Sequence, residues 1–229
     1  MFPAPLLVRI EDGTAMRTFL KRIRVDRATV ESIAEQARIT PVFLVLMATS
    51  GVLAAVAFLA NSIPLLVGSM VVAPALPPLA LVAFAVVGGR FSYAAQGFVC
   101  SLAGISFATA FAIATSWLLI AAGVFPSETV LTDMPLLEER VKPGWYSVVA
   151  ALAAGVAGTI ALSQNKYDTL VGVVASLAIV PAAAAAGIAL ISHEPELSLG
   201  GLILLGINAG LIIVTGIVTL VIFRPDKTA

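Results

Sequence analysis

Charged residues are scarce in this chain. Only 11% of its 229 residues are Asp, Glu, Lys or Arg, whereas 60% are hydrophobic and the mean hydropathy is +1.06. A soluble domain needs more polar side chains to cover its surface, so this composition excludes that class and indicates an integral membrane protein. The 13 basic and 13 acidic residues cancel, and no segment resembles a nucleic-acid-binding module. We therefore expect no nucleic-acid partner.

Cysteine and histidine are almost absent as well. Cys100 is the single cysteine and lies in an apolar segment, which excludes an internal disulfide and indicates a small core residue. The single histidine, His193, has only Glu194 and Glu196 beside it, too few ligands for a metal site. No Gly-x-Ser-x-Gly motif, phosphate-binding loop or metal-spaced cluster occurs, so we expect neither an enzyme nor a cofactor.

Long apolar runs make up most of the chain. A bilayer crossing needs about 20 apolar residues. Six segments qualify, at residues 42–60, 62–88, 93–123, 147–163, 169–191 and 199–223. We predict an all-α polytopic membrane protein with six transmembrane helices. The predicted parts are a cytoplasmic amphipathic N-terminal segment (1–40), a first transmembrane repeat (41–123), an acidic external loop (124–146), a second transmembrane repeat (147–223) and a cytoplasmic tail (224–229).

Basic residues gather on one side of these six segments. Eleven of the 13 Lys and Arg residues fall on the side of the N-terminus, and only Arg140 and Lys142 fall on the other. Because cytoplasmic loops hold an excess of Lys and Arg, we predict that both termini lie in the cytoplasm. The amino terminus has no basic region ahead of an apolar core, so no signal peptide is predicted.

A polar, periodic stretch precedes the first apolar segment. Residues 26–37 place Val30, Ile33, Ala34 and Ala37 on one face of a helix. This spacing predicts an amphipathic helix at the cytoplasmic surface. Basic residues upstream of it favour contact with anionic membrane lipid, the first partner that we expect.

The two halves of the chain resemble each other. A shift of 104 residues, which superimposes Gly51 on Gly155, aligns residues 51–85 with 155–189 without gaps. The identical pairs are Gly51/Gly155, Val52/Val156, Ala57/Ala161, Asn61/Asn165, Leu66/Leu170, Val67/Val171, Gly68/Gly172, Pro77/Pro181, Ala80/Ala184 and Ala85/Ala189. Because each half holds three segments, the second half must enter the membrane from the opposite face. We therefore predict two inverted three-helix repeats, which in many transporters meet at a site near the midplane.

Prolines interrupt the second segment and one occurs in the fifth. The stretch Asn61–Ala80 carries Pro64, Pro74, Pro77 and Pro78, and Pro181 follows in the second half. A proline lacks an N–H, so the carbonyl four residues earlier loses its helical partner. In lipid such a carbonyl must face protein, water or a solute. We predict that helices 2 and 5 are interrupted there; plain kinks inside packed helices are the alternative.

The carbonyls, hydroxyls and amides around these prolines form the predicted site. Its substrate- or ion-binding residues are Ser69, Met70, Ala73, Pro74, Pro77, Pro78, Ser176, Leu177, Pro181 and Asn208, with Gly68 and Gly172 as structural hinges. No charged residue lies well inside a segment, which disfavours a proton-driven carrier. Neutral oxygens suit sodium, potassium or an uncharged polar solute, whereas a helix N-terminus after the break suits an anion. The sequence leaves this choice open.

Three stretches resemble a known family. They are Asn61–Ala80, "GVVASLAIVPAAAAAGIAL" at residues 172–190 and "NAGLIIVTG" at residues 208–216. They are similar to the signatures of the domain of unknown function 389 family, hydrophobic prokaryotic membrane proteins. Ala182 departs from that pattern, because a second proline is frequent there. The resemblance covers roughly residues 26–223. It implies a fold and a location in a prokaryotic plasma (inner) membrane, but no reaction or substrate.

We predict that the protein passes a small solute or ion through the broken helices, and that it forms a homo-oligomer. The alternative is a non-transporting oligomeric scaffold or an envelope-stress or sensor component. In that alternative, small residues pack between chains, at Ala150, Ala154, Gly158, Gly206 and Gly210. A hydrated cavity between the second and fifth segments would favour passage, and a dry, packed centre would favour the scaffold.

Overall fold

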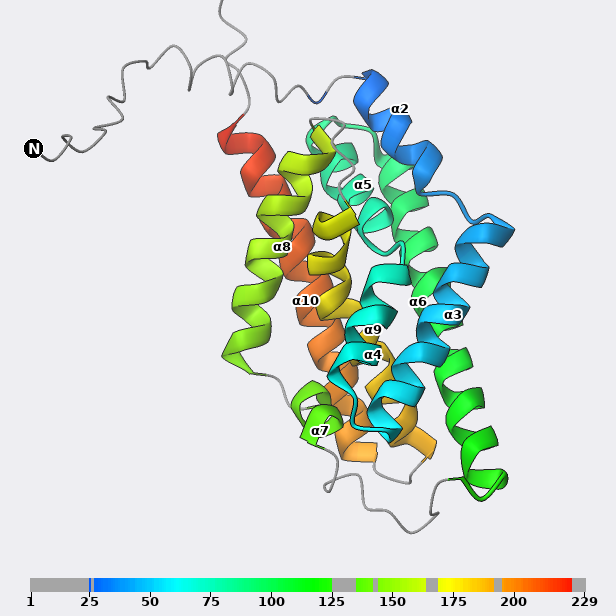
Figure 1. Ribbon diagram of the computed structural model, residues 1–229. Helices are drawn as coiled ribbons and strands as arrows, with labels where there is room; N and C mark the ends of the chain where they lie inside the picture. Colours follow the sequence, from blue (N-terminus) through cyan, green and yellow to red (C-terminus); the bar gives the residue numbers. More distant parts are fainter. Residues whose placement is uncertain are drawn as a thin grey trace, which may run out of the picture.

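The chain folds into a bundle of helices (Figure 1). The computed structural model describes residues 25, 27–124, 135–141, 144–163, 169–191 and 195–223, without the side chains of 135, 139, 169–178 and 195. The helices are α2 (Arg27–Gln36), α3 (Pro41–Leu59), α4 (Ile63–Val72), α5 (Leu76–Val87), α6 (Phe91–Ala121), α7 (Pro135–Val141), α8 (Trp145–Ser163), α9 (Thr169–Ile191) and α10 (Pro195–Ile222). No strand occurs among these residues, so the predicted all-α class is confirmed.

Several of these helices are long and apolar enough to cross a membrane. Within the described residues they are α3, α6, α8 and α10, and the pair α4 and α5, bent by 49°, is either one further broken span or a re-entrant loop. The fifth predicted segment forms α9, in which the described apolar part is Ile179–Ile191. Helix bounds agree with the predicted segments to within about four residues. Six spans in two inverted repeats stay a prediction.

Most of the prolines that the structure describes stand at the beginnings of helices. Pro41 follows Thr40, whose side-chain oxygen accepts a hydrogen bond from the Phe43 N–H at 3.1 Å and so caps α3. Pro64 and Pro77 lie in the first turns of α4 and α5. A proline is tolerated there because an N–H in the first turn has no acceptor within the helix. The sequence alone did not distinguish these helix-starting prolines from helix-breaking ones.

Asn61 ends α3 and turns the chain back on itself. It adopts a left-handed conformation with φ of 47°. Its N–H donates to the Phe58 carbonyl at 3.1 Å, and the Ser62 N–H donates to the Ala57 carbonyl at 2.8 Å. This pair of bonds closes the helix end in the manner usual for Gly or Asn. As a result α4 folds back along α3, against which it packs.

Helix α9 occupies the centre of the bundle. From Ile179 to Ala189 every side chain except the glycine is a buried apolar residue or proline, and α9 packs against α3, α4, α6, α8 and α10. The other long helices pair around it, α3 with α6 and α8 with α10. Small residues allow these pairs to approach closely. A Cβ placed at Gly51 would overlap the carbonyl oxygen of Ala108. A Cβ placed at Gly155 would lie 2.8 Å from the carbonyl oxygen of Ile212.

The outer face of the bundle is apolar. Large exposed side chains include Val42, Phe98, Leu102, Val149, Leu202 and Val218. Soluble proteins rarely expose so much contiguous apolar surface, so this face suits the hydrocarbon of a bilayer. Helix α2 and the C-terminal end of α10 lie at one end of the bundle, and α7 lies at the other (Figure 1).

One face of the N-terminal amphipathic helix packs on the rest of the protein, and the opposite face is exposed. Val30, Ile33, Ala34 and Ala37 are buried, as the periodicity predicted. Helix α2 rests on α5 and α6. Its charged side is exposed, with Arg27 donating to the Glu31 carboxylate at 2.7 Å. The pKa of Arg27 is raised by this hydrogen bond and by the charge of Glu31.

Candidate functional site at the helix break

The break between α4 and α5 follows from the covalent structure of proline. Pro74 disfavours the helical region for the residue before it, and Ala73 adopts φ −73° and ψ 118°. Pro74 also lacks the N–H that the Met70 carbonyl would need to continue α4. Helix α5 starts again at Leu76, with its axis bent by 49° from that of α4. The predicted interruption of the second segment is thus confirmed.

The break is rich in carbonyl oxygens and poor in N–H groups. The last four carbonyls of α4, from Ser69 to Val72, have no partner within the helix. Of the first four positions of α5, two are Pro77 and Pro78, which carry no N–H. A helix N-terminus attracts anions through such N–H groups. The composition of this break therefore favours a cation or a hydrogen-bond donor over an anion.

Ser50 and Ser69 fasten the end of α4 to α3. The Ser50 hydroxyl donates to the Ser69 carbonyl at 2.7 Å, and both side chains are fully buried. The Ser69 hydroxyl donates to the Leu66 carbonyl at 2.7 Å. The predicted ligand Ser69 thus uses its hydrogen within α4, and only its oxygen lone pairs remain for another partner.

A small cavity lies beside the break. Its volume is about 10 Å³, close to the smallest space that holds one water molecule. Four helices and the break contribute its walls, namely Phe43, Met47, Ala75, Pro78, Leu79, Ser101, Ile105 and Ile179. Ser101 is the one polar side chain among them, and its buried Oγ has no hydrogen-bond partner among the described residues. The centre is therefore almost closed, with a single hydroxyl inside.

The structure brings together some of the predicted site residues. Met70, Ala73, Pro78 and Pro181 are buried, and Pro74 and Pro77 are partly buried. Of the predicted ligands whose side chains the structure describes, Pro78 alone lines the cavity. Asn208 is 1% exposed on α10. The side chains of Ser176, Leu177 and Gly172 lie outside the described residues.

The predicted interruption of the fifth segment is wrong. Helix α9 continues through Pro181 from Thr169 to Ile191. One proline removes one hydrogen bond, whereas the second segment carries three prolines within five residues, at Pro74, Pro77 and Pro78. A single missing bond is tolerated where neighbouring helices enclose the backbone, as they enclose α9. The two segments are nevertheless adjacent, because α9 packs on both α4 and α5.

The small residues differ in what surrounds them. No described atom lies within 4 Å of a Cβ placed at Gly68, and the predicted role of Gly68 as a hinge stays a prediction. Gly158 would meet Leu76 at 2.7 Å and Ala154 is fully buried, so both pack inside one chain and not between chains. Gly206 and Gly210 have no described neighbour within 4 Å.

Ser101 is not among the predicted site residues, although a pattern of small residues on α6 points to it. The buried residues of α6 are all small and recur every three or four positions, at Gly97, Cys100, Gly104, Ala108, Ala112 and Ser116. A Cβ at Gly97 would lie 2.6 Å from the Pro78 carbonyl oxygen. This close approach brings the neighbouring Ser101 to the break.

Comparison with known proteins gives a family and one distant relative. The family model described as Domain of unknown function (DUF389) matches residues 70–214. Uncharacterized protein MJ0678 of Methanocaldococcus jannaschii is 25% identical over 165 residues, which cover 72% of this chain and 49% of that protein. The chain thus spans about half the length of this relative. No solved structure matches.

Proposed function

The chain belongs to the family described as Domain of unknown function (DUF389), and from its own geometry we propose that it passes a small solute or ion across a membrane. The proposed path crosses the break between α4 and α5, beside α9. The observation that carries the proposal is a buried helix break, rich in carbonyls and next to an unpartnered hydroxyl, in a bundle with an apolar outer face.

Equivalent contacts in the two halves support the inverted repeat. Gly51 of α3 meets the carbonyl of Ala108 on α6, and Gly155 of α8 meets the carbonyl of Ile212 on α10. Gly155 and Ile212 each lie 104 residues after their counterparts Gly51 and Ala108, and the same shift of 104 residues aligns the two halves of the sequence. Independent helix hairpins have no reason to choose equivalent contact points.

Contacts between the halves are also equivalent. A Cβ at Gly216 of α10 would lie 3.0 Å from that of Ala83 on α5, and one at Gly187 of α9 would lie 2.8 Å from Thr109 on α6. Under the same shift Ala83 corresponds to Gly187, and Gly216 corresponds to Ala112, one turn from Thr109. Such reciprocal pairing is expected of two repeats related by a pseudo-twofold axis.

The solute that fits this path is a small cation, such as sodium or potassium, or an uncharged polar molecule. The carbonyls at the end of α4 and the Ser101 hydroxyl offer neutral oxygen ligands. Passage requires the cavity beside Ser101 to widen from its volume of about 10 Å³. The break supplies a joint at which α4 and α5 can change their angle, since a bent, unbonded segment resists rotation less than a continuous helix.

A second candidate is a packed membrane module that transports nothing. The small, apolar cavity favours this candidate, because a resting channel or carrier more often holds several waters. In that case the exposed Gly206 and Gly210 face of α10 serves contact between chains in a homo-oligomer.

Substitution of Ser101 distinguishes the two candidates. Ser101→Ala removes a buried hydroxyl that has no partner among the described residues, and Ser116→Ala removes another. Ser116 lies about 22 Å from Ser101 along the same helix, outside the cavity. Both variants should be as stable as the wild type or more stable. Passage predicts that Ser101→Ala alone lowers flux, by roughly fivefold for one lost hydrogen bond.

The assay is the uptake of radioactive rubidium, sodium and glycerol into vesicles that contain the purified protein. Flux of at least one probe above that of protein-free vesicles, reduced in Ser101→Ala and retained in Ser116→Ala, would support passage. If the wild type moves none of the three probes, or if the two variants lose flux equally, the path beside Ser101 is excluded.

A further inference from the structure

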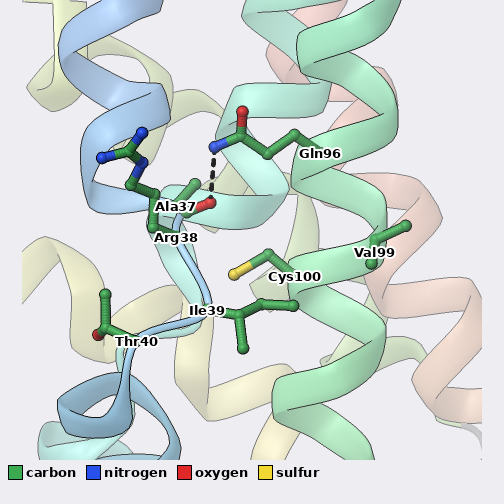
Figure 2. A pocket seen from close by; sticks show the side chains of 7 residues that line it. All are labelled: Ala37, Arg38, Ile39, Thr40, Gln96, Val99 and Cys100. Carbon is green, nitrogen blue, oxygen red and sulfur yellow. Dashed lines mark hydrogen bonds between the residues drawn. The ribbon is translucent and has the colours of Figure 1, made fainter.

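Two adjoining hollows lie where α2, the linker after it and α6 meet. The larger has a volume of about 510 Å³, with polar groups from Arg38, Thr40 and Gln96 and apolar groups from Ile39, Val99 and Cys100 (Figure 2). The smaller, of about 260 Å³, is bounded by Glu31, Glu35 and Tyr93. Arg38 and Gln96 belong to both. We refer to these two neighbouring hollows together as the α2–α6 groove; none of the residues of the helix break lines it.

Hydrogen bonds hold the walls of this groove in place. The Gln96 amide donates to the Ala34 carbonyl at 2.8 Å and to the Ala37 carbonyl at 3.0 Å (Figure 2 shows the second). The Ala34 carbonyl belongs to the last turn of α2 and the Ala37 carbonyl follows directly after it, where the helix offers no N–H partner. The buried face of α2, with Val30 and Ile33, fixes the same helix to α5 and α6. The groove is therefore a built feature and not a gap beside a loose helix.

Polar and apolar groups follow one another along the groove. From Tyr93 through Gln96 to Val99 the distance along α6 is about 9 Å. Glu31, Glu35 and Tyr93 mark the polar end, and Arg38 lies between them and the apolar end. Beyond Val99 the surface is apolar, with Leu102 57% exposed. The groove thus crosses the boundary between the charged helix α2 and the surface that faces lipid.

The charged residues of the groove differ in whether they form an ion pair. Glu31 is paired with Arg27, which lines neither hollow. Glu35 and Arg38 are exposed and make no ion pair within the part of the chain that the structure describes. A ligand in the groove therefore meets an available carboxylate at its polar end and an available guanidinium nearer the membrane.

We propose that the α2–α6 groove binds the headgroup of an aminophospholipid, phosphatidylethanolamine. Its ammonium contacts Glu35, its phosphate receives paired hydrogen bonds from Arg38, and an acyl chain lies along Ile39 and Val99. A guanidinium fits phosphate geometry well, and an ammonium suits a carboxylate. An anionic lipid without an amine would place its negative charge beside Glu31 and Glu35, which disfavours it. The inference needs the membrane location and does not need passage.

Native mass spectrometry of the detergent-purified protein tests this binding. Phosphatidylethanolamine and phosphatidylglycerol with identical acyl chains are added in turn, and the fraction of lipid-bound protein is measured. We expect the wild type to bind phosphatidylethanolamine roughly tenfold more tightly, the effect of one charge-assisted interaction. Equal binding, or preference for phosphatidylglycerol, would overturn the proposal.

Single substitutions assign the two ends of the headgroup. Arg38→Gln should weaken binding of both lipids roughly tenfold, whereas Glu35→Gln should remove only the preference for phosphatidylethanolamine. Arg27→Gln removes one positive charge from α2, outside the groove, and should leave the affinities within about twofold. Equal losses in Arg38→Gln and Arg27→Gln would show nonspecific attraction and contradict the site. Displacement by millimolar free phosphoethanolamine would contradict the role of the acyl chain.

Discussion

Replacing Gly51 by alanine tests the closest contact between the long helices. Its Cβ would overlap the carbonyl oxygen of Ala108 and would lie 2.8 Å from the carbonyl carbon. Both are backbone atoms of α6, which cannot move aside as the end of a side chain can. Overpacking of this kind costs about 1–3 kcal/mol, and we expect the upper half of that range because a helix must shift.

The matched control is Gly68→Ala on α4. No described atom lies within 4 Å of a Cβ at this position, so the substitution adds no overlap within the chain. Alanine in a helix is more favourable than glycine by about 0.5–1 kcal/mol, so this variant should be more stable than the wild type. The two glycine substitutions should therefore change the free energy of unfolding in opposite directions, with a difference of about 3 kcal/mol.

Thermal unfolding of the purified protein in detergent measures both effects, with the fluorescence of Trp117 and Trp145 as the signal. Gly155→Ala should behave like Gly51→Ala, because it would meet Thr215 and the Ile212 carbonyl in the equivalent contact. A Gly51→Ala protein that unfolds at or above the wild-type temperature would refute the packing of α3 on α6. A Gly155→Ala protein without a loss would refute the equivalence of the halves.

Two further predictions concern single contacts. Ser50→Ala should destabilise the protein by about 0.6 kcal/mol, and at most about 1.7 kcal/mol, because the Ser69 carbonyl loses a hydrogen bond. Thr49→Ala is the control in the same unfolding assay, because the Thr49 hydroxyl bonds within its own helix. An equal loss of stability in Thr49→Ala would contradict a role for the hydrogen bond between α3 and α4. Ala83→Cys with Gly216→Cys, in a chain that carries Cys100→Ala, should form a disulfide between α5 and α10 under mild oxidation, detected by a mobility shift on gels; failure to form it would place these helices too far apart.

The sequence predicted the features that covalent chemistry and composition dictate. Apolar runs located the long helices, and the prolines of Asn61–Ala80 predicted a break in the second segment, because a proline without an N–H cannot continue a helix. The periodicity of Val30, Ile33 and Ala37 predicted the buried face of α2, which the structure confirms. Each of these features depends on the local chain and requires no knowledge of its neighbours.

The remaining features depend on which helices meet. Pro181 carries the same local chemistry as Pro74, yet α9 continues through it within the packed centre. In the sequence, Ser101 is one of several hydroxyl residues in apolar segments. In the fold, Gly97 allows α6 to approach the Pro78 carbonyl closely, and this places Ser101 beside the break. Gly158 had the spacing of a contact between chains, but its partner is Leu76 of the same chain. All three features depend on which helices pack together in the fold, and the sequence alone does not show that packing.

The most direct test of the path through the break is to restore the helix there. A variant with Pro74→Ala, Pro77→Ala and Pro78→Ala regains the N–H groups that the carbonyls of Met70, Ala73 and residue 74 require, so α4 and α5 can join. Flux of rubidium, sodium and glycerol into vesicles is then compared with that of the wild type and of Pro181→Ala, in which α9 is already continuous. Loss of flux in the triple variant, with flux retained in Pro181→Ala, is the predicted result. Undiminished flux through a folded triple variant would contradict it.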